Sequence, residues 1–470
     1  MPTTPFSATA SATAAAPATT TATAAVTATT TAGQSAPSAH GTHGAPQAHH
    51  NDMSAAENGV ILDHQPAQTG TDAARSTTSP GRLIGGQPVA VWVVAFAAMV
   101  SFMGIGLVDP ILKSIAGNLN ATASQVTLLF TSYLLVTAFA MLVTSFFSSR
   151  LGGRLTLIIG LVVIIVFSSL AGTSSTVAAL VGWRAGWGLG NALFIATALA
   201  AIVAVARGGA EKAITLYEAA LGVGISAGPL LGALLGGIQW RLPFFGVAAL
   251  MAIALIAIVL FLKTKITVAH GVSIMAPLTA LSHGGILVMG IAALLYNGGF
   301  FAVLAWTPFA VPLGVYGIGF MFFGWGVLVG ICAVWGAPWM HRRFGLITSF
   351  SAAIGLFSLI LVGVALAVAA GSVPTVIALV IACGIPLGVL NTLFTQSAMN
   401  IAPVPRPVAS AGYNFVRFLG GAVSPWICGK IGESVGPAAP FWFGATCVAA
   451  ALAVLLGFGS RYLRRINTIH

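Results

Sequence analysis

The chain has 470 residues, of which 57% are hydrophobic and only 6% are charged. A soluble domain has about a quarter of its residues charged, so this composition excludes a soluble globular protein and indicates a polytopic membrane protein. The formal net charge of +11 is dispersed between apolar runs rather than clustered, which argues against a nucleic-acid-binding surface.

Residues 1–87 are rich in Ala, Thr, Ser, Pro and His and contain few large apolar side chains. A segment of this composition cannot bury a core, so we expect a disordered cytoplasmic tail. It lacks the continuous apolar stretch of a secretory signal peptide. The folded part of the protein is therefore expected to begin near residue 88.

From residue 88 the sequence becomes a series of apolar runs of about 20 residues, each long enough to cross a hydrocarbon core as a helix. We predict twelve transmembrane helices and hence an all-α membrane protein. Their approximate limits are residues 88–112, 125–148, 155–172, 176–206, 213–237, 243–262, 284–308, 318–340, 346–370, 374–399, 408–429 and 438–460.

Basic residues concentrate in alternate loops between these runs, beginning with Arg150 and Arg154 after the second run. The positive-inside rule then places both termini in the cytoplasm of a multi-pass cell-membrane protein. Residues 263–283 become a cytoplasmic linker between two halves of six helices, residues 88–262 and 284–470, the latter ending in a short basic tail.

The two halves repeat in sequence. Tyr217, Gly224 and Pro229 of the fifth run recur as the same residue types 196 positions later, in the eleventh run. Two similar bundles are implied, with a site between them near the middle of the membrane. The repeat fails at Glu218, whose counterpart is the neutral Asn414. An acid in one half only suggests chemistry rather than packing.

A ridge of small residues follows Glu218. The residues that recur at every fourth position are Ala220, Gly224, Gly228, Gly232 and Gly236. On a helix they share one face, against which another helix backbone can lie closely. Pro229 in the middle of the ridge removes a backbone hydrogen bond and bends the helix. The alternative is that the glycines only pack and that Glu218 faces water at a helix end.

Three motifs resemble those of a known transporter family. They are SFFSSRLGGR from Ser145, RAGWGLGNA from Arg184 and GISAGPLLG from Gly224, and longer runs from Met103, Gln125 and Trp240 are similar as well. They resemble the drug:proton antiporter branch of the major facilitator superfamily, in particular the bacterial aromatic compound/drug exporter family of multidrug resistance proteins. The resemblance implies two pseudo-symmetric six-helix bundles that alternate access to a central site.

The same resemblance assigns motif residues to gating. They are Arg150, Gly152, Arg154, Gly224, Gly228, Pro229 and Gly232. Ser149 stands where the loop motif usually has Asp, which weakens the usual pairing of charges between helix and loop. In the resembled antiporters the arginine of the fourth helix, here Arg184, regulates protonation of an acid in the first helix.

Beyond residue 88 the only acids are Asp109, Glu211, Glu218 and Glu433. Glu211 and Glu433 fall in predicted loops, so Asp109 and Glu218 remain as candidates for proton coupling, together with Arg184. Intramembrane acids usually mark ion pathways. Asp109 has a structural alternative, because Lys113 lies four residues on and could form a salt bridge with it at the membrane surface.

Aromatic and polar residues along the helices supply a candidate substrate site. The residues that we assign to it are Tyr133, Trp187, Asn191, Tyr217, Tyr296, Asn297, Phe300, Tyr413, Asn414 and Arg417. Aromatic faces suit flat, lipophilic or cationic compounds. The alternatives are core packing and interfacial belts for the aromatic residues, hydrogen bonds between helices for the asparagines, and snorkelling for Arg417.

The sequence therefore predicts a proton-coupled exporter of lipophilic or aromatic small molecules, with the proton and the lipid bilayer as its other partners. A proton-coupled uptake symporter or a facilitator on the same fold is the alternative, since a fold alone does not determine function. We expect a monomer and no enzymatic activity, cofactor or metal, because Walker, dinucleotide-loop and metal-ligand patterns are absent in a suitable context.

Overall fold

The computed structural model describes residues 83–84, 86–207, 209–264, 266, 273, 275–401 and 403–467. The predicted tail up to residue 82 lies outside the described residues. The first described element is a short hairpin, in which β1 (Leu83–Ile84) pairs antiparallel with β2 (Gln87–Pro88). This hairpin lies slightly before the expected boundary at residue 88 and includes it.

The first half of the chain forms a helical bundle. Its helices are α1 (Val89–Gly106), the 3₁₀ turn η1 (Asp109–Ile111), α2 (Leu112–Asn118), α3 (Ala123–Leu151), α4 (Gly153–Gly172), α5 (Val177–Val205), α6 (Gly209–Gly236) and α7 (Leu242–Phe261). The first apolar run continues through η1 and α2 to Asn118, six residues beyond its predicted end at residue 112.

The second half forms another bundle. Before it, in the predicted linker, lies the short helix α8 (Ala276–Ala280). The bundle contains α9 (Gly284–Ala310), α10 (Val315–Ile331), the π-helical turn η2 (Cys332–Gly336), α11 (Ala337–Phe344), α12 (Leu346–Ala369), α13 (Val373–Ala382), α14 (Gly384–Asn400), α15 (Arg406–Ser434), α16 (Ala439–Val454), the π-helical turn η3 (Leu455–Gly459) and α17 (Ser460–Asn467).

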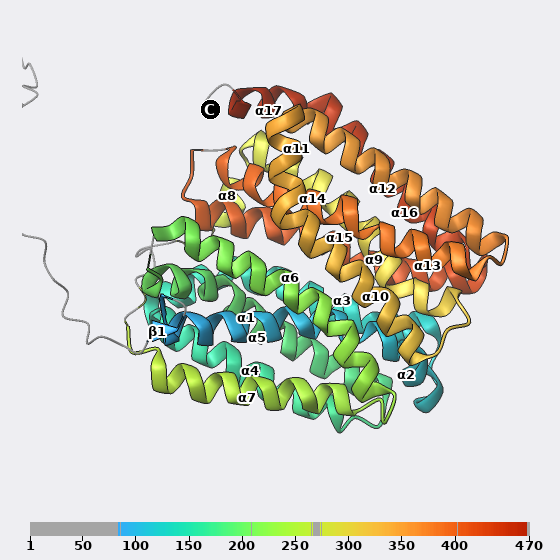
Figure 1. The fold of residues 1–470 in the computed structure, drawn as a ribbon, viewed down its shortest axis with the longest axis horizontal. Helices are drawn as coiled ribbons and strands as arrows, with labels where there is room; N and C mark the ends of the chain where they lie inside the picture. Colours follow the sequence, from blue (N-terminus) through green and yellow to red (C-terminus); the bar gives the residue numbers. More distant parts are fainter. Residues whose placement is uncertain are drawn as a thin grey trace, which may run out of the picture. The chain divides into compact units, whose positions relative to one another are not determined.

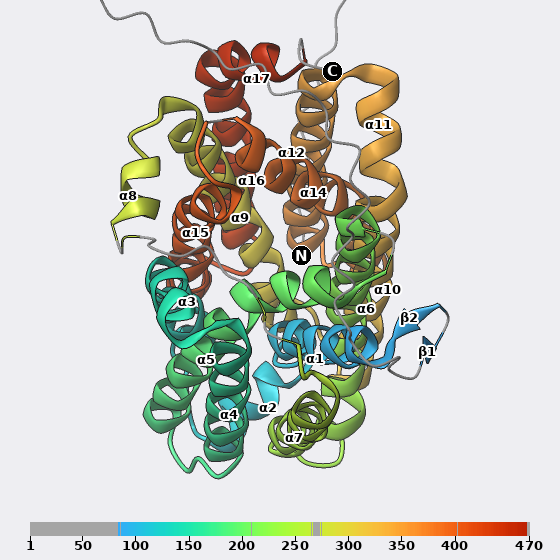
Figure 2. The same cartoon turned by 90° about the vertical axis from the view of Figure 1, so that its left-hand side faces the viewer.

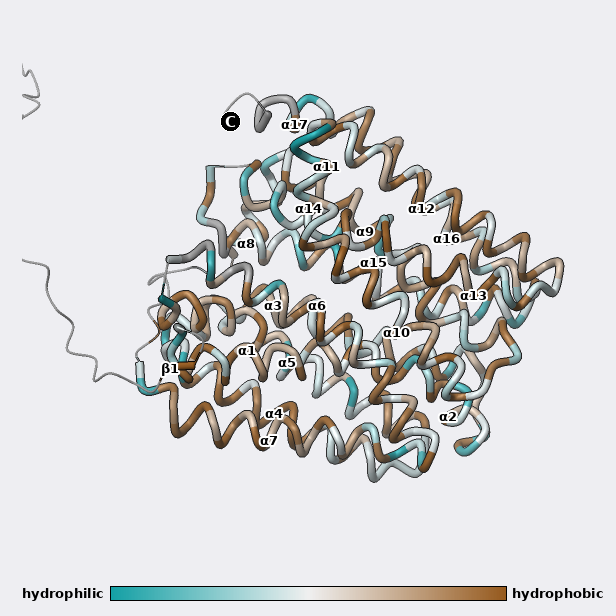
Figure 3. Tube along the Cα trace, in the orientation of Figure 1, coloured by the Kyte–Doolittle hydropathy of each residue, from teal (hydrophilic) through white to brown (hydrophobic). Residues whose placement is uncertain are grey.

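Eleven helical segments of the described residues are long and apolar enough to cross a membrane. The twelfth predicted helix is α15, which is more polar because it carries Arg417, Lys430 and Glu433. It packs mainly against α3 and α9, so much of its surface meets protein rather than lipid. Figure 3 shows apolar residues along the helices and hydrophilic segments at their ends. The prediction of twelve helices in two six-helix bundles is confirmed.

The two bundles face each other through two helix pairs. Figures 1 and 2 show α1 to α7, in blue and green, on one side and α9 to α17, in yellow to red, on the other. Across the interface α6 packs against α10, and α3 packs against α15. The interface is pseudo-symmetric, because α3 and α6 of the first bundle correspond to α10 and α15 of the second.

The ridge of small residues on α6 faces α1 of its own bundle. Gly228 lies so close to the α1 backbone that a Cβ there would come 2.6 Å from the carbonyl oxygen of Met103, and Gly224 and Gly232 make equally close approaches one turn away on either side. Contacts of this kind are possible only without side chains. The second half repeats the arrangement, because Gly420 of α15 lies against the backbone of α9.

A different face of α6 meets the second bundle. A Cβ at Gly222 would lie 3.3 Å from the Cα of Gly330, and one at Gly326 would lie 2.6 Å from the Cα of Ser226. Helix α6 therefore carries small residues on two faces, one directed at α1 and one at α10. A single helix is thus packed closely against both bundles.

Two side-chain hydrogen bonds join the bundles at the same end, the end that the charge pattern predicts to lie outside the cell. Lys113 Nζ donates to the carbonyl oxygen of Val311. Glu433 Oε1, in the last turn of α15, accepts from the backbone N–H of Ser124 at 2.7 Å. The structure, in its described part, is thus closed at this end by polar contacts as well as by packing.

The contact of Glu433 gives a pH-dependent contribution to stability. Partial burial opposes ionisation, but hydrogen bonding by Ser124 outweighs it and holds the pKa of Glu433 below its ordinary value. A depressed carboxyl pKa contributes stability above the pKa of the unfolded chain, about 4.3, and this contribution is lost as the pH falls through the folded pKa.

We therefore expect Glu433→Gln to lower the unfolding temperature of the purified protein by about 1 °C at pH 7, because the Glu433 side chain is exposed. The difference should vanish below about pH 4. Differential scanning fluorimetry across this pH range measures it, with Ser434→Ala as the matched control on the same helical turn. A difference that persists unchanged at acidic pH would contradict the role of the carboxylate.

Candidate functional site

A central pocket lies at the interface between the bundles. It is lined by Ile225, Tyr296, Asn297, Phe300, Trp325, Val329, Leu387, Asn391 and Arg417. These residues come from α6 of the first bundle and from α9, α10, α14 and α15 of the second. The pocket therefore lies between the halves, where the sequence repeat predicts a site.

One side of the pocket is polar. Arg417 Nη2 donates to Asn391 Oδ1 at 2.5 Å, and Asn297 Nδ2 donates to the carbonyl oxygen of Arg417 at 3.0 Å. The guanidinium carbon of Arg417 lies 5.9 Å from the ring centre of Tyr296. These contacts fix the position of the guanidinium, which is the only charged group among the lining residues.

Glu218 of α6 interacts electrostatically with Arg417 across the interface between the bundles. Glu218 lies about 14 Å along α6 from its first residue, and Arg417 about 16 Å along the equivalent helix α15. The two charges thus occupy similar depths on helices of opposite bundles. Glu218 is half-buried.

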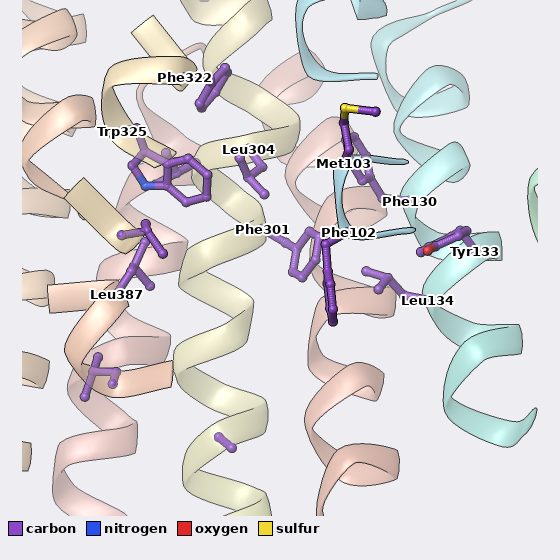
Figure 4. Close-up of a cluster of buried hydrophobic side chains, with 14 of the residues drawn as sticks. Phe102, Met103, Phe130, Tyr133, Leu134, Phe301, Leu304, Phe322, Trp325 and Leu387 are labelled. Carbon is purple, nitrogen blue, oxygen red and sulfur yellow. The ribbon is translucent and has the colours of Figure 1, made fainter. Parts of the chain in front are cut away.

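The other side of the pocket is aromatic. The rings of Phe300 and Trp325 lie 5.6 Å apart, and Phe300 also contacts Phe301 at 4.8 Å. Phe301 meets Phe130 of α3 edge to face at 6.1 Å, which extends this layer into the first bundle. Figure 4 shows Trp325 and Leu387 on the helices of the second bundle and the layer that links Phe301 to Phe130. Such rings provide flat apolar surface for an aromatic ligand.

A second charged cluster lies inside the first bundle. Asp109 is fully buried in η1, and neither of its carboxylate oxygens has a hydrogen-bond partner among the described residues. Arg184 is also fully buried and donates through Nη1 to the carbonyl oxygen of Gly104 at 3.1 Å. Its guanidinium carbon lies 4.5 Å from the ring centre of Tyr133 and 4.6 Å from that of Trp187.

Asp109 and Arg184 interact electrostatically without a direct hydrogen bond. The proposed alternative partner of Asp109 is engaged elsewhere, since Lys113 donates to the carbonyl oxygen of Val311 in the other bundle. A buried carboxylate that lacks a hydrogen-bond donor is costly in its charged form and is therefore suited to take up a proton.

The predicted gating loop between α3 and α4 keeps its contacts within the first bundle. Gly152 adopts a φ of 83°, a conformation that favours glycine and allows the sharp turn between the helices. Arg154 Nη2 donates to the carbonyl oxygen of Val259 in α7 at 3.2 Å. Arg150 lies over the ring of Phe146, 4.7 Å from its centre.

The predicted substrate residues divide into two groups. Tyr296, Asn297, Phe300 and Arg417 line the central pocket, and Tyr413 interacts electrostatically with Arg417 just behind it. The structure brings these five residues together, although they come from two separate helices. They form the larger part of the polar and aromatic surface of the pocket.

The remaining predicted residues do not line this pocket. Tyr133 and Trp187 surround Arg184 instead. Asn191 accepts a hydrogen bond from Ser101 Oγ.

Asn414 and Tyr217 also contact residues outside the pocket. Asn414 Nδ2 donates to Ser410 Oγ at 3.2 Å, within α15. Tyr217 packs edge to face against Phe102, with ring centres 6.0 Å apart. Tyr217 thus has the packing role that was its alternative, whereas the hydrogen bond of Asn414 lies within its own helix and not between helices.

Sequence reasoning did not assign Ile225, Trp325, Val329, Leu387 and Asn391 to the site, although all five line the pocket. Trp325 and Asn391 had a usable signal, because they are a large aromatic residue and a neutral polar residue within apolar runs. The three aliphatic residues had none, since such residues are found on every face of a transmembrane helix.

Comparison with known proteins extends these observations. The sequence profile of the Major Facilitator Superfamily matches residues 94–425. The chain is 49% identical over 384 residues to the multidrug efflux protein YfmO of Bacillus subtilis (strain 168), which covers 82% of this chain and 96% of that protein.

More distant similarities follow the same pattern. The chain is 30% identical over 185 residues to the tetracenomycin C resistance and export protein of Streptomyces glaucescens, covering 37% of this chain and 34% of that protein. The crystal structure of the human organic anion transporter MFSD10 (TETRAN) is similar with a TM-score of 0.60 and 16% identity, over 78% of this chain and 99% of that chain. At this identity the likeness is one of fold alone.

Proposed function

Because this chain belongs to the Major Facilitator Superfamily, we propose that it is a proton-coupled exporter of lipophilic or aromatic compounds. The resemblance predicted from its sequence motifs is confirmed, and the chain is a multi-pass membrane protein of a transporter family rather than an enzyme family. The observation that carries the proposal is the central pocket, whose wall is shared by both bundles.

A pocket in this position suits alternating access. When the bundles rock against each other about a central site, the site opens to one side of the membrane and then to the other. The contacts of α6 with α10 support such movement, because small residues at the interface leave no interlocking side chains between the two helices. The direction of transport is proposed from the similarity to a multidrug efflux protein over nearly its whole length.

We assign proton coupling to Asp109 and Glu218, with Arg184 as the partner of Asp109. Asp109 is the preferred carrier, because its buried oxygens have no hydrogen-bond partner and Arg184 is close enough to interact with its charge. The described helices contain no other acid at comparable depth, since Glu211 lies in the first turn of α6 and Glu433 in the last turn of α15. A fixed charge cannot couple transport to a proton gradient.

The proposed orientation puts both termini in the cytoplasm of a monomeric cell-membrane protein. The end of the bundles with Lys113 and Glu433 then faces outward, and their contacts with the opposite bundle close the outer side. With the outer side closed, the substrate of an exporter would enter from the cytoplasm.

The test uses the full chain in proteoliposomes loaded with a fluorescent lipophilic dye. An imposed pH gradient should drive dye transport in exchange for protons, and collapse of the gradient by a protonophore should stop net transport. Dye and protons moving in the same direction would instead support the uptake symporter. Dye movement that is unaffected by the gradient would overturn proton coupling.

A further inference from the structure

We propose that the central pocket binds the acidic group of an aromatic compound, a carboxylate or sulfonate on a flat ring system, with Arg417 as its counter-charge. The proposal rests on the proposed transport function and specifies the class of substrate. A binding site lined by an acidic side chain would suit a cationic compound. This pocket has the opposite character, because its one charged lining group is a guanidinium.

A hydrogen bond to Asn391 orients the guanidinium of Arg417, but not all of its N–H donors have a partner. Arg417 Nη2 donates to Asn391 Oδ1 at 2.5 Å, whereas Nε is buried and has no hydrogen-bond partner among the described residues. An arginine fork offers five N–H donors in a plane and binds carboxylates with two parallel hydrogen bonds. A ligand oxygen can therefore use donors that the protein leaves without partners.

A second donor lies on the aromatic side of the pocket. Trp325 is 1% exposed, and its indole Nε1 has no hydrogen-bond partner in the described part of the chain. An indole N–H can only donate, so it requires an acceptor. Arg417 and Trp325 thus each bring a buried N–H without a partner to the lining of one pocket, which favours a ligand that carries hydrogen-bond acceptors.

The ring system of such a ligand has a defined place. Phe300 and Trp325 form a tilted aromatic pair with centres 5.6 Å apart, and the ring of Tyr296, 5.9 Å from the guanidinium carbon of Arg417, also lines the pocket. Leu387 and Val329 complete the apolar wall. An aromatic acid therefore places its ring on the apolar side and its charge on the polar side.

Glu218 limits the charge of the occupied pocket. It is the acid that interacts electrostatically with Arg417, and it does so from the opposite bundle. When Glu218 is ionised, it repels a bound anion, so removal of its charge strengthens anion binding. On this assignment Glu218 tunes the charge preference of the pocket, and Asp109 is left as the group that carries the proton.

If the substrate is an anion, each transport cycle moves net charge across the membrane. Export of a monoanion in exchange for one incoming proton transfers two positive charges inward per cycle, so the membrane potential acts twice. A cation exchanged for one proton gains nothing from the potential, and a neutral compound gains half as much as the anion.

The experiment measures binding of three probes to the purified full-length protein in nanodiscs by fluorescence titration. Anthracene-2-carboxylate, its neutral methyl ester and anthracen-2-ylmethylammonium share one ring system and differ in charge. We expect the carboxylate to bind at least about tenfold more tightly than the ammonium compound. Arg417→Gln should remove this preference, so that the ratio of the carboxylate and ester affinities falls toward one.

Two further variants keep the test decisive if Arg417→Gln does not fold. Arg417→Lys should retain part of the preference, because it keeps the charge and loses the fork. Glu218→Gln should tighten binding of the carboxylate and not of the ester. Preference for the ammonium compound, or an unchanged ratio of carboxylate to ester in the Arg417 variants, would overturn the proposal.

The outcomes separate this inference from the proposed function. Binding of the probes needs no gradient, so selective binding of the carboxylate without gradient-driven transport would refute the exporter and leave the anion site standing. Gradient-driven export of cationic dyes by a protein that ignores the carboxylate would refute the anion site and leave the exporter standing.

Discussion

Replacement of Asp109 by Asn is expected to abolish proton-driven accumulation of substrate while leaving energy-independent exchange intact. The carboxylate of Asp109 is fully buried and has no hydrogen-bond partner among the described residues. Asn has the same shape but cannot change its charge. The variant should therefore bind substrate and still alternate, but it should do so without moving a proton.

The expected loss is large. One proton that moves down a gradient of one pH unit supplies about 1.4 kcal/mol, which corresponds to about a tenfold concentration ratio of substrate. In proteoliposomes with such a gradient, Asp109→Asn should reduce this ratio to unity. Counterflow, in which unlabelled substrate on one side drives uptake of labelled substrate on the other, should stay within about twofold of the unaltered protein.

Glu433→Gln is the matched control, because it neutralises an acid of the outer end that has no contact with the central pocket. It should keep the gradient response. If Asp109→Asn retains a full response and Glu218→Gln loses it, the carrier is Glu218. Proton-driven accumulation by the double variant Asp109→Asn, Glu218→Gln would refute both assignments.

The sequence was sufficient for the fold because lipid imposes a simple rule on it. Backbone groups inside a bilayer must be satisfied within the segment, so apolar runs of about 20 residues become helices. Even α15, the helix with the least apolar run, was predicted from residues 408–429, and this run repeats the residue types of Tyr217, Gly224 and Pro229. Its polar residues are tolerated because α3 and α9 cover it.

The pocket was only partly predictable for a related reason. In a soluble protein the apolar face of a helix marks the core, whereas in a membrane both the lipid face and the protein face are apolar. Ile225 and Leu387 therefore look no different from residues that meet lipid. Arg417 and Asn297 could be identified, because polar side chains at depth must have partners within the protein.

The contact of Lys113, which joins segments distant in sequence, was not predictable. Lys113 lies four residues from Asp109 and appeared to be its partner by helical spacing. The helix continues through α2 to Asn118, and this brings Lys113 to the carbonyl oxygen of Val311 in the other bundle. The spacing of charges within one helix therefore could not reveal a partner that a different helix supplies.

Replacement of Gly228 by Leu is expected to abolish transport while the protein still reaches the membrane. A Cβ at this position would already lie 2.6 Å from the Met103 carbonyl oxygen, so a larger side chain must push α1 away from α6. Helix α1 also supplies the Gly104 carbonyl oxygen that holds Arg184 and leads into η1 with Asp109. Displacement of α1 thus disturbs the coupling cluster and the packing together.

The packing alone gives a measurable cost. Overpacking of a close interface typically destabilises a protein by about 1–3 kcal/mol, so the variant should unfold at a lower temperature in fluorimetry. Its dye efflux in cells should fall to the level of cells without the protein, at equal amounts of protein in the membrane fraction. Gly228→Ala should have a smaller effect in the same direction, because its side chain ends at Cβ.

Gly182→Leu is the matched control for this prediction. Gly182 is also a helical glycine of the first bundle, but it is exposed and a Cβ there would meet nothing within 4 Å. It should keep efflux and unfolding temperature close to those of the unaltered protein, because the added side chain has room. If Gly228→Leu behaved like Gly182→Leu, α1 and α6 would not need their close contact during transport, and the ridge would have no mechanical role.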